Sequence, residues 1–145
     1  MDQKRIKLRR SIVETAIILL VITWGMVSCF SMPEIVELPA GYSGWVVVKY
    51  EDPHCSRLQR RWFLRVIAIG PSGEACTSES AAQKWQYVRY QYRRPYGSLV
   101  TIRATGWGGG GSIWAGSYSN QKKVETFFVG SEEKLNASWA SEPKL

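Results

Sequence analysis

The sequence predicts an all-β protein, in which a single small antiparallel β-sandwich follows an N-terminal signal or membrane helix and ends in a short C-terminal helix. Three observations lead to this fold class. The chain has 145 residues, which suits one folded domain. Most of it consists of short segments rich in β-branched and aromatic residues, separated by turn residues. The exceptions are an apolar run near the N-terminus and a helical pattern near the C-terminus.

Residues 1–28 have the pattern of an export signal. Five of the first ten residues are cationic, and a nearly uninterrupted apolar run, Ala16–Val27, follows them. A helix from Ala16 to Phe30 is about 22 Å long, which is shorter than the roughly 30 Å hydrocarbon core of a bilayer. A cleaved signal is therefore favoured over a membrane span. Either interpretation places the rest of the chain on the extracytoplasmic side of a membrane, in the periplasm or at the cell surface.

The end of the apolar run, Gly25-Met26-Val27-Ser28-Cys29, resembles the lipobox of bacterial lipoprotein signal peptides. The resemblance implies that the Cys29 thiol receives a diacylglyceryl group and becomes the mature N-terminus. Met26 stands where leucine is usual, and an uncleaved signal anchor is the alternative. Residues 29–37 are then predicted to be the lipidated N-terminus and a tether.

The predicted β-sandwich occupies residues 38–130. In its first strand Val46, Val48 and Tyr50 share one face, while the residues between them share the other. Turns follow one another at near-regular intervals, which favours an antiparallel sandwich over any fold with a parallel sheet. The predicted strands are Gly44–Tyr50, Trp62–Gly70, Glu74–Ser78, Trp85–Tyr92, Leu99–Thr105, Ile113–Ser119 and Val124–Val129. The third of these follows a Pro-Ser-Gly turn and is expected to pair with the second as a hairpin.

Residues 131–145 are predicted to form a short helix and a tail. The helical segment is Ser131–Trp139, in which Glu132 and Glu133 occupy the first turn. Negative charge at that position stabilises a helix through its dipole. The polar residues that follow continue no pattern, so we expect them to form the tail.

Three segments of the domain resemble a bacterial group of small uncharacterised lipoprotein domains that opens with Pro-x-Gly-Tyr-x-Gly and a Val-rich strand. The segments are residues 38–48 (LPAGYSGWVVV), 67–74 (IAIGPSGE) and 127–133 (FFVGSEE). The resemblance implies a fold and a location but no activity. No catalytic residue is carried over from it.

Cys55 and Cys76 are predicted to form a disulfide. Once Cys29 is set aside, they are an even pair in a compartment that permits oxidation. The bond would close a loop of about 22 residues and stabilise the fold by roughly 3 kcal/mol. A metal or nucleophile site that also used His54 is weakly supported, because the chain has one histidine and no fourth ligand at a recognisable spacing. We expect no metal and no cofactor.

The net charge of +7 does not indicate a nucleic-acid partner. Residues 1–29 hold five basic residues against two acidic ones, so the other 116 residues carry 14 basic and 10 acidic residues, a balance of +4. Within that part, Lys84–Tyr96 interleaves cations with aromatic residues, which suits an anionic polysaccharide, a lipid headgroup or an acidic protein. A strand with one buried aromatic face and one solvated Arg-rich face is the simpler interpretation of the same segment.

A Gly-rich run, residues 106–111, matches the Gly pattern of a dinucleotide site. No helical pattern follows it, so nothing is predicted to hold a pyrophosphate, and we interpret it as a hairpin loop that displays Trp107. The candidate ligand-binding residues of the domain are Arg93, Arg94, Tyr96, Trp107 and Trp114.

These observations predict a non-catalytic, membrane-anchored envelope lipoprotein that binds another envelope component, either a protein or a polysaccharide. One alternative is an inhibitor or immunity protein that inserts its Gly-rich loop into an exported enzyme. A small exported hydrolase that uses His54 is less favoured, because no nucleophile elbow accompanies the single histidine.

Overall fold

The computed structural model describes residues 13–25, 32–82, 87–104 and 110–143, and the chain divides into two compact units. The described part of the first unit is a helix over residues 13–25, whose side chains are all exposed. No helix within the described ranges combines the length and apolar character needed to cross a bilayer. The second unit holds all of the described strands and is the domain discussed below.

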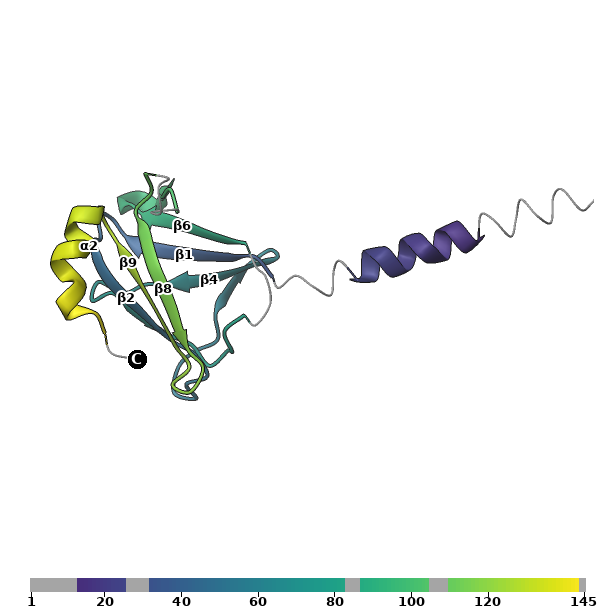
Figure 1. Ribbon diagram of the computed structural model, residues 1–145, viewed down its shortest axis with the longest axis horizontal. Helices are drawn as coiled ribbons and strands as arrows, with labels where there is room; N and C mark the ends of the chain where they lie inside the picture. The colour runs from purple at the N-terminus through teal and green to yellow at the C-terminus, as the bar shows by residue number, and fades with distance from the viewer. Residues whose placement is uncertain (1–12, 26–31, 83–86, 105–109, 144–145) are drawn as a thin grey trace, which may run out of the picture. The chain divides into compact units, whose positions relative to one another are not determined.

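The domain is built from two mixed β-sheets (Figure 1). The five-stranded sheet has the order β3-β4-β1-β6-β7 and the four-stranded sheet the order β5-β2-β9-β8. The strands are β1 (Glu34–Pro39), β2 (Gly44–Lys49), β3 (Gln59–Arg61), β4 (Leu64–Ala68), β5 (Glu74–Cys76), β6 (Val88–Arg93), β7 (Leu99–Thr101), β8 (Ile113–Ser119) and β9 (Val124–Val129). The helical elements are η1 (Pro95–Gly97), α2 (Glu132–Ser138) and η2 (Trp139–Ser141).

The prediction of a mainly β fold with a short C-terminal helix is confirmed, but the prediction of a purely antiparallel sandwich is wrong. β1 runs parallel to both β4 and β6, and β2 runs parallel to β5. The cause is the order in which the chain visits the sheets, because it crosses from one to the other after β1, β2, β4, β5 and β7. After the crossing to β5 and back, β6 runs in the same direction as β4, because both are parallel to β1. After the earlier crossing to β2 and back, the chain enters as β3 in the opposite direction, and the turn to β4 restores the direction of β1. Alternation of apolar residues predicts which segments form strands, but not which strands become neighbours.

β1 is the central strand of the five-stranded sheet, although residues 29–37 are predicted to be a tether. Glu34 and Glu37 give this segment a polar character, yet both are buried. Glu34 pairs with Arg65 at 3.7 Å and Glu37 with Arg61 at 2.9 Å. Charges are buried in a sheet when they are paired in this way. The strand β1 therefore belongs to the domain, which begins at Met32, before residue 38.

β5 lies in the four-stranded sheet beside β2, and the hairpin predicted between it and the preceding strand is absent. The predicted turn is present, since the Gly73 N–H donates to the Gly70 carbonyl at 3.0 Å. Gly73 has a φ of +84°, and a Cβ at this position would clash with the Tyr42 hydroxyl. That hydroxyl donates to the Trp45 carbonyl in β2, so the turn is fitted closely against the second sheet.

The hydrophobic core lies between the two sheets. The face that the alternation predicts is buried in it, and it consists of Val46 and Val48 in β2 and of Tyr50 directly after β2. The disulfide between Cys55 and Cys76 is also present, and it connects the loop after β2 to the end of β5. The buried members of the core are Val36, Leu38, Val46, Val48, Tyr50, Ile67, Ile69, Ile102, Phe127 and Val129.

Helix α2 packs against the outer face of the four-stranded sheet, next to β2 and β9 (Figure 1). Its N-cap is Ser131, whose hydroxyl accepts a hydrogen bond from the Lys134 N–H. Leu135 packs with Phe128 and Trp114, and the Trp45 ring lies across Phe128 at 5.4 Å between centroids. The helix thus covers apolar side chains that the core between the sheets does not.

Candidate functional site

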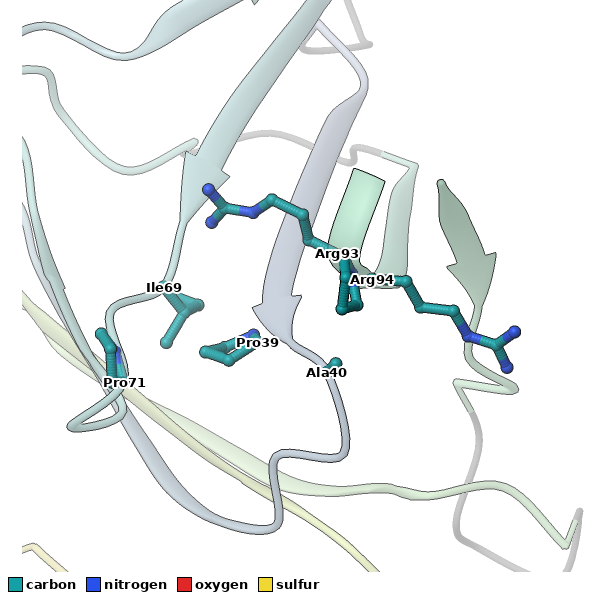
Figure 2. A pocket seen from close by; sticks show the side chains of 7 residues that line it. Pro39, Ala40, Ile69, Pro71, Arg93 and Arg94 are labelled. Carbon is teal, nitrogen blue, oxygen red and sulfur yellow. The ribbon is translucent and has the colours of Figure 1, made fainter. Parts of the chain in front are cut away.

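A hollow lies at the carboxyl ends of β1, β4 and β6. Because these strands are parallel, their carboxyl ends meet at one edge of the five-stranded sheet. The hollow has a volume of about 360 Å³ (Figure 2). The residues that line it are Pro39, Ala40, Ile69, Pro71, Arg93, Arg94 and Pro95.

The floor of the hollow is apolar. Pro39 ends β1, and Ile69, which is only 2% exposed, directly follows β4. The Ile69 N–H donates to the Glu37 carbonyl at 2.8 Å and thereby holds the two strand ends together. Proline has no N–H to offer, so Pro39 and Pro71 present ring carbons to a ligand and no backbone donors. The floor therefore suits an apolar face, such as the C–H face of a sugar ring.

Arg93 and Arg94 supply the positive charge at the rim. Successive residues of an extended chain point in opposite directions. Figure 2 shows this for the two side chains, since Arg93 reaches across toward the end of β4 while Arg94 extends away from it. The predicted pair is therefore brought to one hollow, but only Arg93 spans it.

Arg93 shares the Glu37 carboxylate with Arg61. Arg61 Nη2 lies 2.9 Å from Glu37 Oε1, whereas Arg93 Nε lies 3.8 Å from Oε2. The Glu37 side chain is 6% exposed, and the two arginine side chains are about half exposed. Two guanidinium groups thus face one carboxylate, and the closer ion pair belongs to Arg61. The surplus positive charge lies on Arg93, where it can bind an anion from solution.

Tyr96 stands beside the hollow and is fully exposed. It lies in η1, between Pro95 of the rim and Gly97, in a turn that the Arg94 N–H closes by donating to the Ser98 carbonyl at 2.9 Å. Its φ of +65° is a conformation that side chains with a Cβ rarely adopt. The turn therefore holds an aromatic ring in solvent at the expense of backbone strain.

Trp114, a candidate ligand-binding residue from the sequence, does not line this hollow and is buried. It is 8% exposed, and its Nε1–H donates to the Gly130 carbonyl at 2.7 Å. It packs under α2, so helix packing explains its presence. Trp107 and Cys29 lie outside the described residues.

A polar pair that the sequence did not single out lies between the sheets, where the Tyr50 hydroxyl donates to Glu125 Oε2 at 2.8 Å. Burial raises the pKa of Glu125, and the hydrogen bond from Tyr50 partly opposes that shift. Burial and the nearby Glu125 charge raise the pKa of Tyr50. The pair is partly buried next to the core, and its effect is on stability.

His54 lies in an exposed turn next to the disulfide, with its backbone N–H donating to Asp52 Oδ1 at 2.9 Å. Across the ranges that the structure describes, no group of three or more His, Cys, Asp and Glu side chains could hold a metal ion. The sequence did not indicate Pro39 and Ile69 as lining residues of the hollow, nor Glu37 as the partner of Arg93. The sequence feature that could have indicated them is a proline at or after the end of a strand. Pro39 ends β1, and Pro71 follows β4.

The domain belongs to the class of small two-layer β folds with mixed sheets and an open hollow at one sheet edge. A crystal structure described as a "Putative Lipoprotein from Bacillus anthracis" has a similar fold, with a TM-score of 0.56 and 16% sequence identity over 79% of this chain and 80% of that chain. At this identity the likeness shows the fold alone. No family model matches the chain, and no curated protein matches it in sequence. The resemblance to a lipobox and to the Pro-x-Gly-Tyr-x-Gly group therefore stays a prediction.

Proposed function

We propose that this chain is an exported, membrane-anchored lipoprotein whose β domain binds an anionic envelope component and catalyses no reaction. The observation that carries the binding role is the hollow, in which an apolar floor lies next to the half-exposed guanidinium of Arg93. Charged hydrogen bonds between arginine and a carboxylate or phosphate are among the strongest polar contacts in proteins. An acidic polysaccharide offers both a C–H face for the floor and an anionic group for Arg93.

Three observations support the location. The N-terminus has a cationic segment, a short apolar run and a lipobox-like end at Cys29. The Cys55–Cys76 disulfide suits an oxidising compartment outside the cytoplasm. The protein from Bacillus anthracis with the similar fold carries the description "Putative Lipoprotein".

The binding role is tested with the full-length chain purified from membranes in detergent. The probe is a fluorescein-labelled alginate oligosaccharide, whose uronic acids carry carboxylates, and binding is followed by fluorescence anisotropy. Arg93→Gln is expected to weaken binding about tenfold, the effect of losing one charged hydrogen bond. Glu37 keeps its closer partner, Arg61, in this variant, so the sheet is expected to stay intact.

The matched control is Lys122→Gln, which removes the same charge from the exposed turn between β8 and β9. An equal effect of both substitutions would mean that only net charge matters and would refute the site. A parallel affinity purification from detergent-solubilised envelopes, with wild type against Arg93→Gln, identifies the natural component. If the wild-type chain retains neither a glycan nor a protein there, the proposed binding role is wrong.

A further inference from the structure

The amino ends of the same three parallel strands form an edge with exposed apolar side chains, which we call the amino edge. Met32 precedes β1, Trp62 and Phe63 form the turn before β4, and Tyr87 precedes β6. Trp62 is 90% exposed, Phe63 76% and Tyr87 64%. Figure 1 shows the starts of these strands at the end of the domain opposite α2. Large apolar side chains grouped on a surface in this way mark an interaction site.

Arginine side chains accompany the aromatic ones at the amino edge. Arg60 Nη1 lies 3.6 Å from the Met32 sulfur, and the Arg89 guanidinium carbon lies 6.0 Å from the centre of the Tyr87 ring. Arg61 directly precedes Trp62 and is also exposed. Tryptophan and tyrosine with neighbouring arginine are the residues enriched where proteins meet the headgroup layer of a bilayer.

A polar hollow of about 320 Å³ adjoins the amino edge at Arg60. Two arginines and two serines line it, and these residue types supply the donors that a phosphate group requires. The one acidic group in the lining, Glu79, already pairs with Arg60 at 3.5 Å and with Arg65 at 3.8 Å. The lining consists of Arg57, Arg60, Ser78, Glu79 and Ser80.

The short tether keeps the amino edge close to a membrane, a step that rests on the lipid anchor of the proposed function. Cys29 precedes Met32 by three residues, which span at most about 11 Å even when fully extended. The headgroup layer on each side of a bilayer is about 5–8 Å thick. Because the domain begins at Met32, this short connection holds the amino edge next to the headgroups. A tether that extended to residue 37 would have allowed the amino edge to move away from the membrane.

We propose that the amino edge docks on the bilayer surface, with Trp62 and Phe63 in the interfacial layer and the Arg57–Arg60 hollow around the phosphate of an anionic phospholipid. Docking fixes one orientation of the domain. β1 has six residues and is about 20 Å long, so the Arg93 hollow at its other end faces away from the membrane.

The test measures how deeply Trp62 lies in a membrane. The lipidated chain is reconstituted into vesicles of phosphatidylcholine and phosphatidylglycerol, with or without bromine atoms near the headgroup end of the acyl chains. Subtracting the emission of Trp62→Phe from that of the wild type isolates the Trp62 signal. We expect bromine to quench more than half of this signal. The matched control is Trp139→Phe. Subtracting its emission from that of the wild type isolates the signal of Trp139, a half-exposed tryptophan at the α2 end of the domain, and bromine should leave this signal unchanged.

The headgroup hollow is tested with Arg57→Gln/Arg60→Gln. This double variant should shift the docked population about tenfold toward the undocked state and so reduce the quenching of Trp62 in the same vesicles. Lys134→Gln removes a charge from the exposed side of α2, at the opposite end of the domain, and should leave the quenching unchanged.

Vesicles that float with bound protein but do not quench the Trp62 signal would overturn docking and assign the amino edge to a protein partner. The lipid anchor would survive that result. Failure of the protein to float with the vesicles would overturn the anchor and the docked orientation together. If the wild-type protein docks on vesicles but does not bind alginate, the binding role of the Arg93 hollow is refuted. The docking result is then unaffected.

Discussion

The charge cluster around Arg65 gives the sharpest prediction for the stability of the domain. Arg65 is buried, and its Nε lies 3.7 Å from Glu34 Oε2 and 3.8 Å from Glu79 Oε2. Its Nη2 also donates to the Ser80 carbonyl at 2.9 Å. Arg65→Met keeps most of the side-chain length but removes the charge that balances two carboxylates. Breaking a buried ion pair on one side costs about 3–5 kcal/mol. Because the Glu79 side chain is partly exposed, we expect the lower end, about 3 kcal/mol.

The assay is urea unfolding followed by tryptophan fluorescence, carried out on the wild type, Arg65→Met, Glu34→Gln and the double variant. The two single substitutions should lower the free energy of unfolding by more in sum than the double variant does, with a coupling of about 1 kcal/mol or more. A coupling below about 0.4 kcal/mol, the usual scatter for independent sites, would refute the reasoning that this ion pair allows β1 to be a central strand.

Three further predictions concern stability. Replacing Cys55 and Cys76 by serine should lower the free energy of unfolding by about 3 kcal/mol for a loop of this length, and unchanged urea midpoints would contradict it. Because burial raises the pKa of Glu125 above its ordinary 4.5, the wild type should lose stability relative to Glu125→Gln as pH rises from 4 to 7, and parallel pH profiles would disprove this. Tyr96→Gly should raise the free energy of unfolding by roughly 1 kcal/mol by relieving its positive φ, as a higher thermal midpoint would show.

The local pattern of the sequence predicts strands well where segments rich in β-branched and aromatic residues lie between turn residues. β8 and β9 begin and end at the predicted residues, and β2 does so to within one residue. β1 was missed because its burial depends on arginines from β3 and β4, partners that are distant in sequence. The parallel pairing was missed for a related reason, since it depends on the order in which the chain crosses between the sheets.

The candidate site could be predicted in part. The interleaved cations and aromatic residues mark Lys84–Tyr96 in the sequence, and this segment supplies Arg93 and Arg94 to the hollow. The apolar floor was not foreseen, because the ends of β1 and β4 reach Arg93 only through parallel pairing. Trp114 is an example of a residue whose environment the local sequence does not predict. Its Gly-rich and Ser-rich neighbours suggest an exposed side chain, but α2 covers it in the folded domain.

The position of β1 at the centre of its sheet also affects when the domain can fold. Ile35 pairs with Val66 in β4 and with Arg89 in β6, so the first strand to be made waits for partners 31 and 54 residues later in the chain. Contacts between residues so far apart in sequence form slowly, because a long loop must close before they are gained. If the chain is exported from its N-terminus, as the proposed function requires, this delay would keep the early segments unfolded while the later ones are still being delivered. The same pairing that makes β1 hard to recognise would thus help the protein to reach the far side of the membrane before its sheet closes.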